Sequence, residues 1–157
     1  MATLNNNTSN VMNTIKVTPT TWAELRAIIE KELARQGKDA DLNFIDTSKI
    51  TNMSDLFDGL EIGRIKIDKW DVSNVTNMAY MFDNATLFNC DLSSWNVSKV
   101  TDMECMFYNA KSFDSDLHTW DMSNVKNKTY MLRGATSFKG RLSNWDAEKI
   151  RKEVLMD

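Results

Sequence analysis

The chain has 157 residues, of which 42% are hydrophobic and 26% are charged, and its formal net charge is -3. These values are typical of one globular domain with a real core, and the small net charge excludes nucleic acid or an anionic membrane as an expected electrostatic partner. No apolar run approaches the roughly 18 residues that cross a bilayer, so no membrane insertion is expected.

Residues 1–17 are rich in Asn and Thr and show no apolar periodicity, which predicts a flexible N-terminal tail. The same stretch has neither the basic region nor the apolar region of a secretory signal peptide. The chain as written is therefore not addressed for export, although a chain trimmed of its signal would look identical.

Residues 18–41 are predicted to form an N-terminal capping helix. Thr21 and Glu24 have the spacing of a capping box, and Gly37 is suited to end the helix. An apolar stripe is formed by Trp22, Leu25, Ile28, Ile29 and Leu33. We expect this stripe to cover the open edge of the repeats that follow.

Residues 42–145 repeat with a period of 25 residues. Tryptophan recurs at Trp70, Trp95, Trp120 and Trp145. Within a unit, Val75, Met78, Met81, Phe82 and Ala85 have the three- and four-residue spacing of a helix face. We interpret the methionine and phenylalanine columns as core, because stacked units bury such a stripe against each other, rather than as a cofactor or partner groove.

One column indicates a left-handed backbone. It contains Gly59, Asn84, Asn109 and Gly134, and these two residue types share a tolerance of positive φ. This column is predicted to close each short helix. The intervening pattern F-x-x-x-L-x-x-W-[DN]-[VM]-S suits a short strand followed by a turn.

The predicted fold class is therefore α/β: a short right-handed leucine-rich-repeat-like solenoid, with one short strand and one short helix in each 25-residue unit. The repeat pattern decays at Lys126 and Lys128. Residues 146–157 are predicted to be a C-terminal capping helix.

The units WDVSNVTNMAYMFDNATLFNCDL and WNVSKVTDMECMFYNAKSFDSDL closely resemble the bacterial surface protein repeat of about 25 residues, a relative of the BspA-like leucine-rich repeats. The resemblance covers roughly residues 42 to 147. It implies a right-handed solenoid that binds host proteins, matrix or other cells, that serves in adhesion, and that has no catalytic activity. Unlike the usual family member, this sequence lacks a lipobox and a surface-anchoring segment.

Acidic columns and isolated reactive residues do not form an identifiable catalytic or metal site. Stacked carboxylates could bind calcium or serve as paired acids, but we favour the interpretation that they satisfy backbone groups in turns. The acidic columns are Asp46, Asp71, Asn96, Asp121 and Asp146, and separately Asp91 with Asp116. His118 lies in a variable column and has no recognisable nucleophile beside it. Cys90 and Cys105 are not equivalent in the repeat, which argues against a disulfide. No catalytic residue, cofactor or metal is predicted.

The variable columns are the candidates for a binding surface. On the predicted strand side they are Lys69, Asp71, Ser94, Asn96, His118, Thr119 and Asp121. On the predicted helical side they are Tyr80, Tyr108 and Tyr130, near the variable Glu104 and Cys105.

The expected function is non-enzymatic protein binding by a surface or secreted repeat protein, with a host or neighbouring-cell surface protein as its partner. The alternative is an intracellular binding protein, such as an inhibitor, an immunity protein or a phage-borne regulator. An enzyme would need convergent ionisable groups in a pocket, and the sequence shows none.

Overall fold

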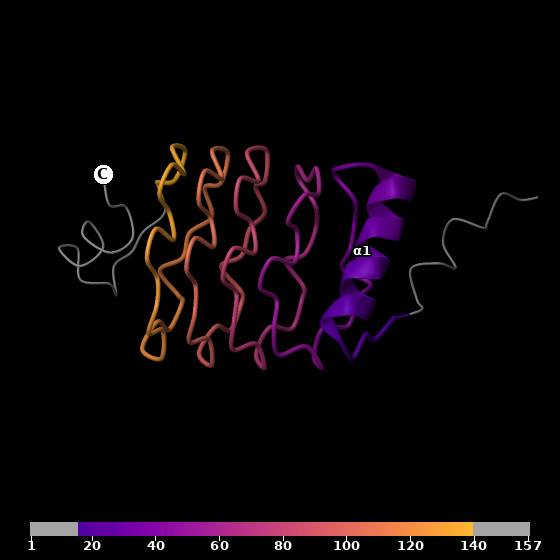
Figure 1. The fold of residues 1–157 in the computed structure, drawn as a ribbon, viewed down its shortest axis with the longest axis horizontal. Coiled ribbons are helices and arrows are strands. Elements are labelled where there is room, and N and C mark those ends of the chain that lie inside the picture. Colours follow the sequence, from indigo (N-terminus) through magenta and orange to yellow (C-terminus); the bar gives the residue numbers. More distant parts are fainter. Residues whose placement is uncertain (1–15, 140–157) are drawn as a thin grey trace, which may run out of the picture.

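The computed structural model describes residues 16–139. In this part of the chain, one α-helix is followed by coils of backbone that lie side by side along one axis, with the helix at the N-terminal end (Figure 1). Most of the tail expected over 1–17, the closing helix expected over 146–157, and Trp145 lie outside the described residues.

Helix α1 (Trp22–Gln36) forms where the sequence predicts it. The Thr21 hydroxyl accepts the backbone N–H of Glu24 at 3.2 Å, and the Glu24 carboxylate accepts the N–H of Thr20, one residue before the cap, at 2.7 Å. Gly37, at φ 83°, ends the helix and donates its N–H to the Leu33 carbonyl at 2.8 Å. The expected capping signals at both ends are thus used.

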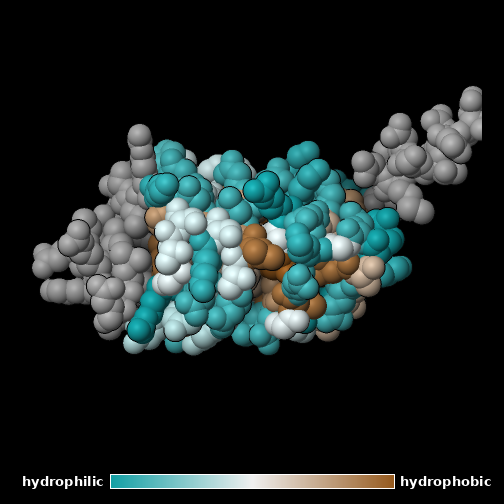
Figure 2. All heavy atoms as spheres, turned by 90° about the horizontal axis from the view of Figure 1, so that it is seen from above, coloured by the Kyte–Doolittle hydropathy of each residue, from teal (hydrophilic) through white to brown (hydrophobic). Residues whose placement is uncertain are grey.

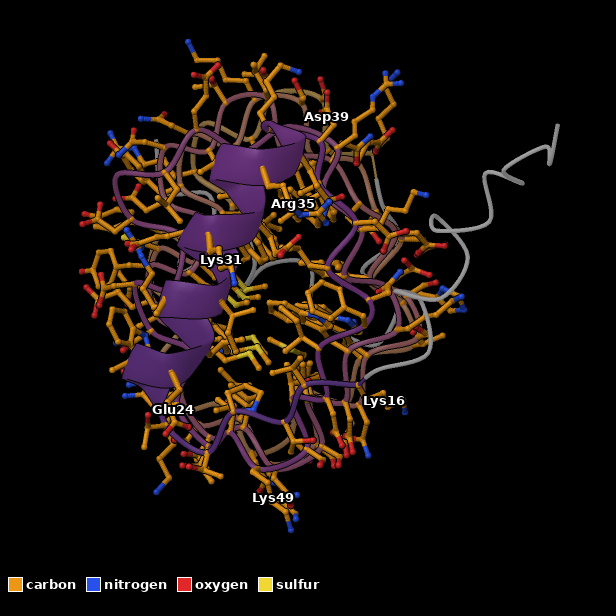
Figure 3. All side chains as sticks on the ribbon, turned by 90° about the vertical axis from the view of Figure 1, so that its right-hand side faces the viewer. Lys16, Glu24, Lys31, Arg35, Asp39 and Lys49 are labelled. Carbon is orange, nitrogen blue, oxygen red and sulfur yellow. The ribbon has the colours of Figure 1, made fainter. Side chains whose placement is uncertain are left out.

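Leu25 and Ile29 bury the inner face of α1 against the first coil. Arg26 also reaches that coil and donates to the carbonyls of Leu56 (2.9 Å) and Asp58 (2.8 Å). Trp22, which was expected in the buried stripe, stays 37% exposed. Figure 3 looks along the stack from this end and shows the charged side chains of Glu24, Lys31 and Arg35 on the helix.

Successive 25-residue segments are joined by backbone hydrogen bonds between equivalent positions. Isolated parallel bridges connect Asn52 to Asn77, Asn77 to Asp102, and Asp102 to Asn127. Around these bridges the N–H of Met78 donates to the carbonyl of Asp102, 24 residues later, at 2.9 Å. The period seen in the sequence is therefore the distance along the chain between residues that contact each other in adjacent coils.

The predicted leucine-rich-repeat-like solenoid, with one strand and one helix per unit, is wrong. Over residues 16–139, α1 is the one helix and it precedes the repeats, and there are only isolated bridges and no sheet. The apolar three- and four-residue spacing comes instead from tight turns, such as those closed by the N–H of Met81 on the Met78 carbonyl and of Ala85 on the Phe82 carbonyl. Amides that a helix would bond internally bond to the next coil.

Backbone conformation explains why no helix forms in the repeats. The predicted left-handed column is confirmed, with φ of 56° at Asn84 and 53° at Asn109, although it closes a turn and not a helix. A second left-handed column, which the sequence did not reveal, precedes it by four residues and contains Asp55, Tyr80, Cys105 and Tyr130. Two left-handed residues in each unit are incompatible with a continuous right-handed helix.

The predicted core columns are buried. The methionine stripe has 0% exposure at Met53, Met78, Met103, Met81, Met106 and Met131. Aromatic rings of adjacent coils stack, as at Phe82 and Phe107, whose centroids are 5.4 Å apart. The interpretation of these columns as core, and not as a cofactor groove, is confirmed.

Candidate functional site

The acidic column is used to hold turns together. The Oδ1 atoms of Asp46, Asp71, Asn96 and Asp121 each accept the backbone N–H of the serine two residues later, at 2.9–3.1 Å. Hydrogen bonds from the side chain and backbone of that serine lower the pKa of the three aspartates below the ordinary range. The turn interpretation is confirmed, and Asp71, Asn96 and Asp121 of the predicted surface therefore have a structural role.

Residues of the neighbouring column of the predicted surface also form hydrogen bonds within the molecule. The Ser94 hydroxyl donates to the Asp68 carbonyl at 3.0 Å, and the Thr119 hydroxyl donates to the Ser93 carbonyl at 2.7 Å. At Lys69, the backbone N–H donates to the Asn43 side chain at 3.0 Å. These three exposed residues lie in one column, and their contacts join adjacent coils.

His118 lies beside Thr119 and is exposed. Its Nδ1 is 3.0 Å from Asp116 Oδ1, and the same carboxylate oxygen accepts the His118 backbone N–H at 3.1 Å. The side chain is 48% exposed. The imidazole is therefore attached to a turn at the surface and does not line an enclosed pocket.

The predicted tyrosines lie on a different part of the surface and are held in place. The Tyr80 hydroxyl donates to Glu104 Oε1 at 2.7 Å, and Asn127 Nδ2 donates to Glu104 Oε2 at 3.0 Å. The hydrogen bond with Glu104, together with burial, holds the pKa of Tyr80 well above its ordinary value. Tyr80 therefore remains a neutral phenol over the physiological range.

Tyr130 occupies the same column as Tyr80, and the Arg133 guanidinium lies over its ring at 5.1 Å from the centroid. Tyr108 is half-buried one coil earlier, and its backbone N–H donates to the Cys105 carbonyl at 3.0 Å. We call this set of residues the tyrosine surface. It comprises Tyr80, Glu104, Tyr108, Asn127, Tyr130 and Arg133.

The sequence predicted the tyrosines of this surface but missed the residues that support them. Asn127 belongs to a further turn column in which its Oδ1 accepts the Thr129 N–H at 3.2 Å, as Asn77 does with Ala79 at 2.9 Å. The recurrence of Asn or Asp at this position was a visible signal. Nothing in the sequence indicated that Arg133 would stack on Tyr130.

Both cysteines are free, with Cys105 buried and Cys90 half-buried. Burial raises the pKa of both thiols, so they are predominantly protonated at neutral pH. Within 16–139, no three His, Cys, Asp or Glu side chains are grouped so as to hold a metal ion. No helix in that range is both long and apolar enough to cross a membrane.

The fold and its surfaces define a stack of 25-residue coils closed at its N-terminal end by one helix. Residues 27–152 match the family described as Mycoplasma protein of unknown function, DUF285, and the chain belongs to this family. No curated protein and no solved structure matches the chain significantly. The family match supports neither the leucine-rich-repeat fold nor the adhesion function that was expected from the sequence.

Proposed function

We propose that the chain is a non-enzymatic protein-binding module that recognises its partner through the tyrosine surface. The observation that carries the proposal is the fixed geometry of Tyr80, whose hydroxyl is tied to Glu104 while Asn127 holds the other oxygen of that carboxylate. Tyrosine and arginine contribute most to many protein interfaces, and a side chain that is already ordered loses little entropy on binding.

Two features make this surface a better candidate than the column of Lys69, Ser94 and Thr119. The side chains of Ser94 and Thr119 are small, and with their hydroxyls bonded to backbone carbonyls of the preceding coil they offer a partner little surface to bury. The ring of Tyr130 and the guanidinium of Arg133 form a stacked pair that presents both an apolar face and a cation. We expect a partner protein that buries these rings and offers an acceptor to Arg133.

The resemblance to BspA-like repeats supports a surface or secreted location for this binding. The alternative is an intracellular inhibitor, immunity protein or phage-borne regulator. Digestion of intact cells with an external protease separates the two: loss of the chain from unlysed cells places it outside, and protection until lysis favours the intracellular alternative.

Binding by the tyrosine surface is tested with paired variants. Tyr108→Ala with Tyr130→Ala is compared with Lys69→Ala with Thr119→Ala, after urea unfolding has shown that each variant is folded. We expect the partner recovered with the unaltered chain, extracellular or intracellular according to the protease result, to be lost with the tyrosine pair and retained with the control pair. The reverse pattern, or turnover that disappears on changing His118 or Asp121, would refute the proposal.

A further inference from the structure

The first coil differs from the later ones along the side of the stack where Asp39 lies, the upper side in Figures 1 and 3. Gly63 stands where the later coils have Phe88, Phe113 and Phe138. Its N–H donates to the Lys38 carbonyl at 2.8 Å, and an added Cβ would meet the Asp39 carboxylate. The loop that follows α1 therefore lies so close to Gly63 that it leaves no room for a side chain at this position.

Hydrogen bonds present between later coils are absent between the first and second. Phe82 and Asn84 donate to the carbonyls of Met106 (2.9 Å) and Tyr108 (2.8 Å). The equivalent backbone N–H groups of Phe57 and Gly59 make no such bond within the described residues. The two coils are thus joined at Met53 and Asp55 but not at the turn that follows.

Hydrogen bonds between the first two coils are also missing a few residues further along the second coil. Ser112 donates its backbone N–H to the Thr86 carbonyl at 3.2 Å, and Asp114 donates to Asn89 Oδ1 at 3.2 Å. The equivalent N–H groups of Leu87 and Asn89 have no partner among residues 16–139. Asn89 has none because the residue at the accepting position is Arg64, whose guanidinium has no acceptor atom.

A surface groove of about 410 Å³ lies where these hydrogen bonds between the first two coils are missing. Its lining residues are Lys38, Asp39, Gly63, Arg64, Leu87, Asn89 and Ser112. Leu87 is 49% exposed although it is a large apolar residue. Figure 2 shows an apolar patch on this otherwise largely polar face. Leu60, which is partly buried, lines an adjoining depression between the first coil and α1.

The charges beside the groove change sign along the stack. Lys38 is paired with Asp39 at 2.8 Å. The Arg64 charge also helps to lower the pKa of the Asp39 carboxyl, but within the described residues the Arg64 side chain makes no hydrogen bond or ion pair. One coil further on, a depression of about 340 Å³ is lined by Asp91, Asp114 and Asp116 among others. A ligand carboxylate is therefore attracted at the Arg64 end and repelled at the Asp114 end.

We propose that this groove binds an extended segment of a partner protein in which an apolar side chain is followed or preceded directly by Asp or Glu. The apolar side chain packs on Leu87, the carboxylate pairs with Arg64, and peptide carbonyls accept the N–H groups of Leu87 and Asn89. The inference rests on the proposed function for its partner class, but it assigns a second surface and a ligand chemistry.

The chain itself supplies conservative test variants. Leu87→Ser introduces the residue found at the equivalent positions Ser112 and Ser137, and Arg64→Asn introduces the residue found at Asn89. The second variant removes the cation and also offers the missing acceptor to the Asn89 N–H. Both variants are therefore expected to fold. Lys111→Asn, which removes a cation from a later coil, is the matched control.

The probe is a display library of random 12-residue peptides selected on the full chain. We expect enrichment of peptides with an apolar residue adjacent to Asp or Glu, at least tenfold weaker binding to Leu87→Ser and to Arg64→Asn, and unchanged binding to Lys111→Asn. Raising the salt concentration should weaken binding to the unaltered chain. No enrichment, an enriched motif without an acid, or equal binding to all variants would overturn the proposal.

The same experiment distinguishes this site from the tyrosine surface. The selected peptides should bind the variant with Tyr108→Ala and Tyr130→Ala as strongly as the unaltered chain. Failure of the peptide selection with continued tyrosine-dependent capture of a partner refutes only the groove. A concentration-dependent dimer that disappears with Leu87→Ser would instead make a second copy of the chain the occupant, and would also overturn the proposal.

Discussion

The indole Nε1 of Trp95 donates a hydrogen bond to the carbonyl oxygen of Ile67, 28 residues earlier, at 3.1 Å. Trp70 and Trp120 bond in the same way to Leu42 (2.9 Å) and Leu92 (3.0 Å). All three indoles are buried. Each tryptophan therefore fills the core of its own coil and fixes the position of the coil before it.

Replacing Trp95 by Phe should lower the free energy of unfolding by about 1–2 kcal/mol, because one buried hydrogen bond and part of the packing are lost. The Ile67 carbonyl keeps its bond from the Trp70 N–H, which limits the loss. Trp95→Ala should cost about 3–5 kcal/mol through the cavity it leaves. Urea unfolding measures both.

Trp22→Phe is the control, since the Trp22 indole also donates to a carbonyl, that of Ser54 at 2.9 Å, but from a side chain that is 37% exposed. Trp22→Phe should lower the free energy of unfolding by less than Trp95→Phe does. Equal costs at the two positions would contradict the role given to the buried indoles.

Asn84 should tolerate Gly better than Ala. At φ 56° an alanine is strained by about 1–2 kcal/mol, whereas glycine is not. Both replacements lose the bond that the Asn84 side chain accepts from Asn109 at 3.0 Å, so the difference between their unfolding free energies isolates the backbone conformation. An alanine variant as stable as the glycine variant would show that the residue is not left-handed.

Acid should destabilise the fold through the turn aspartates. The folded pKa values of Asp46, Asp71 and Asp121 lie below their ordinary values, so their contribution is complete above about pH 4 and is lost as the pH falls through the folded pKa values. Replacing all three by Asn keeps the turn acceptor, as Asn96 shows with its bond to Ser98.

The triple Asn variant should therefore lose less stability between pH 7 and pH 3 than the unaltered chain does, as measured by urea midpoints. Burial raises the pKa of Asp83 and gives a contribution of opposite sign, but both proteins retain Asp83 and the comparison cancels it. Parallel acid profiles for the two proteins would refute the prediction.

Gly63→Ala should destabilise the fold by about 1 kcal/mol, because the added methyl group displaces the Asp39 carboxylate, which accepts the Arg64 backbone N–H at 2.7 Å. Combining it with Asp39→Ala removes the obstacle, so the double variant should be more stable than the sum of the two single effects predicts. Strict additivity in urea unfolding would indicate that the added methyl group does not displace the Asp39 carboxylate.

The repeat period, the buried columns, the ends of α1 and the left-handed column at Asn84 could all be predicted from the sequence. The helices expected after Val75 and Val100 could not be excluded, because three- and four-residue apolar spacing fits both a helix and a series of tight turns. The decisive residues are Tyr80, Cys105 and Tyr130, which are left-handed in the structure. Their residue types give no such signal, unlike Gly and Asn.

Only part of the tyrosine surface could be predicted, because its side-chain contacts join residues of different coils. Aromatic residues in a variable column are visible in a sequence, but the pairing of Tyr80 with Glu104, 24 residues later, depends on how adjacent coils are aligned. The groove at Leu87 was not predicted. Its sequence signal was the single replacement of a recurrent Phe by Gly63.

Contacts across a fixed 25-residue offset also make the number of coils adjustable. Thr76 donates its N–H to Thr51, Thr101 to Thr76, and Lys126 to Thr101, each at 2.8 Å. Duplicating or deleting one such segment in the middle of the array restores the same donor and acceptor at the new junction. Relatives can therefore differ in length by whole coils while the helix-capped end, with its groove, stays the same.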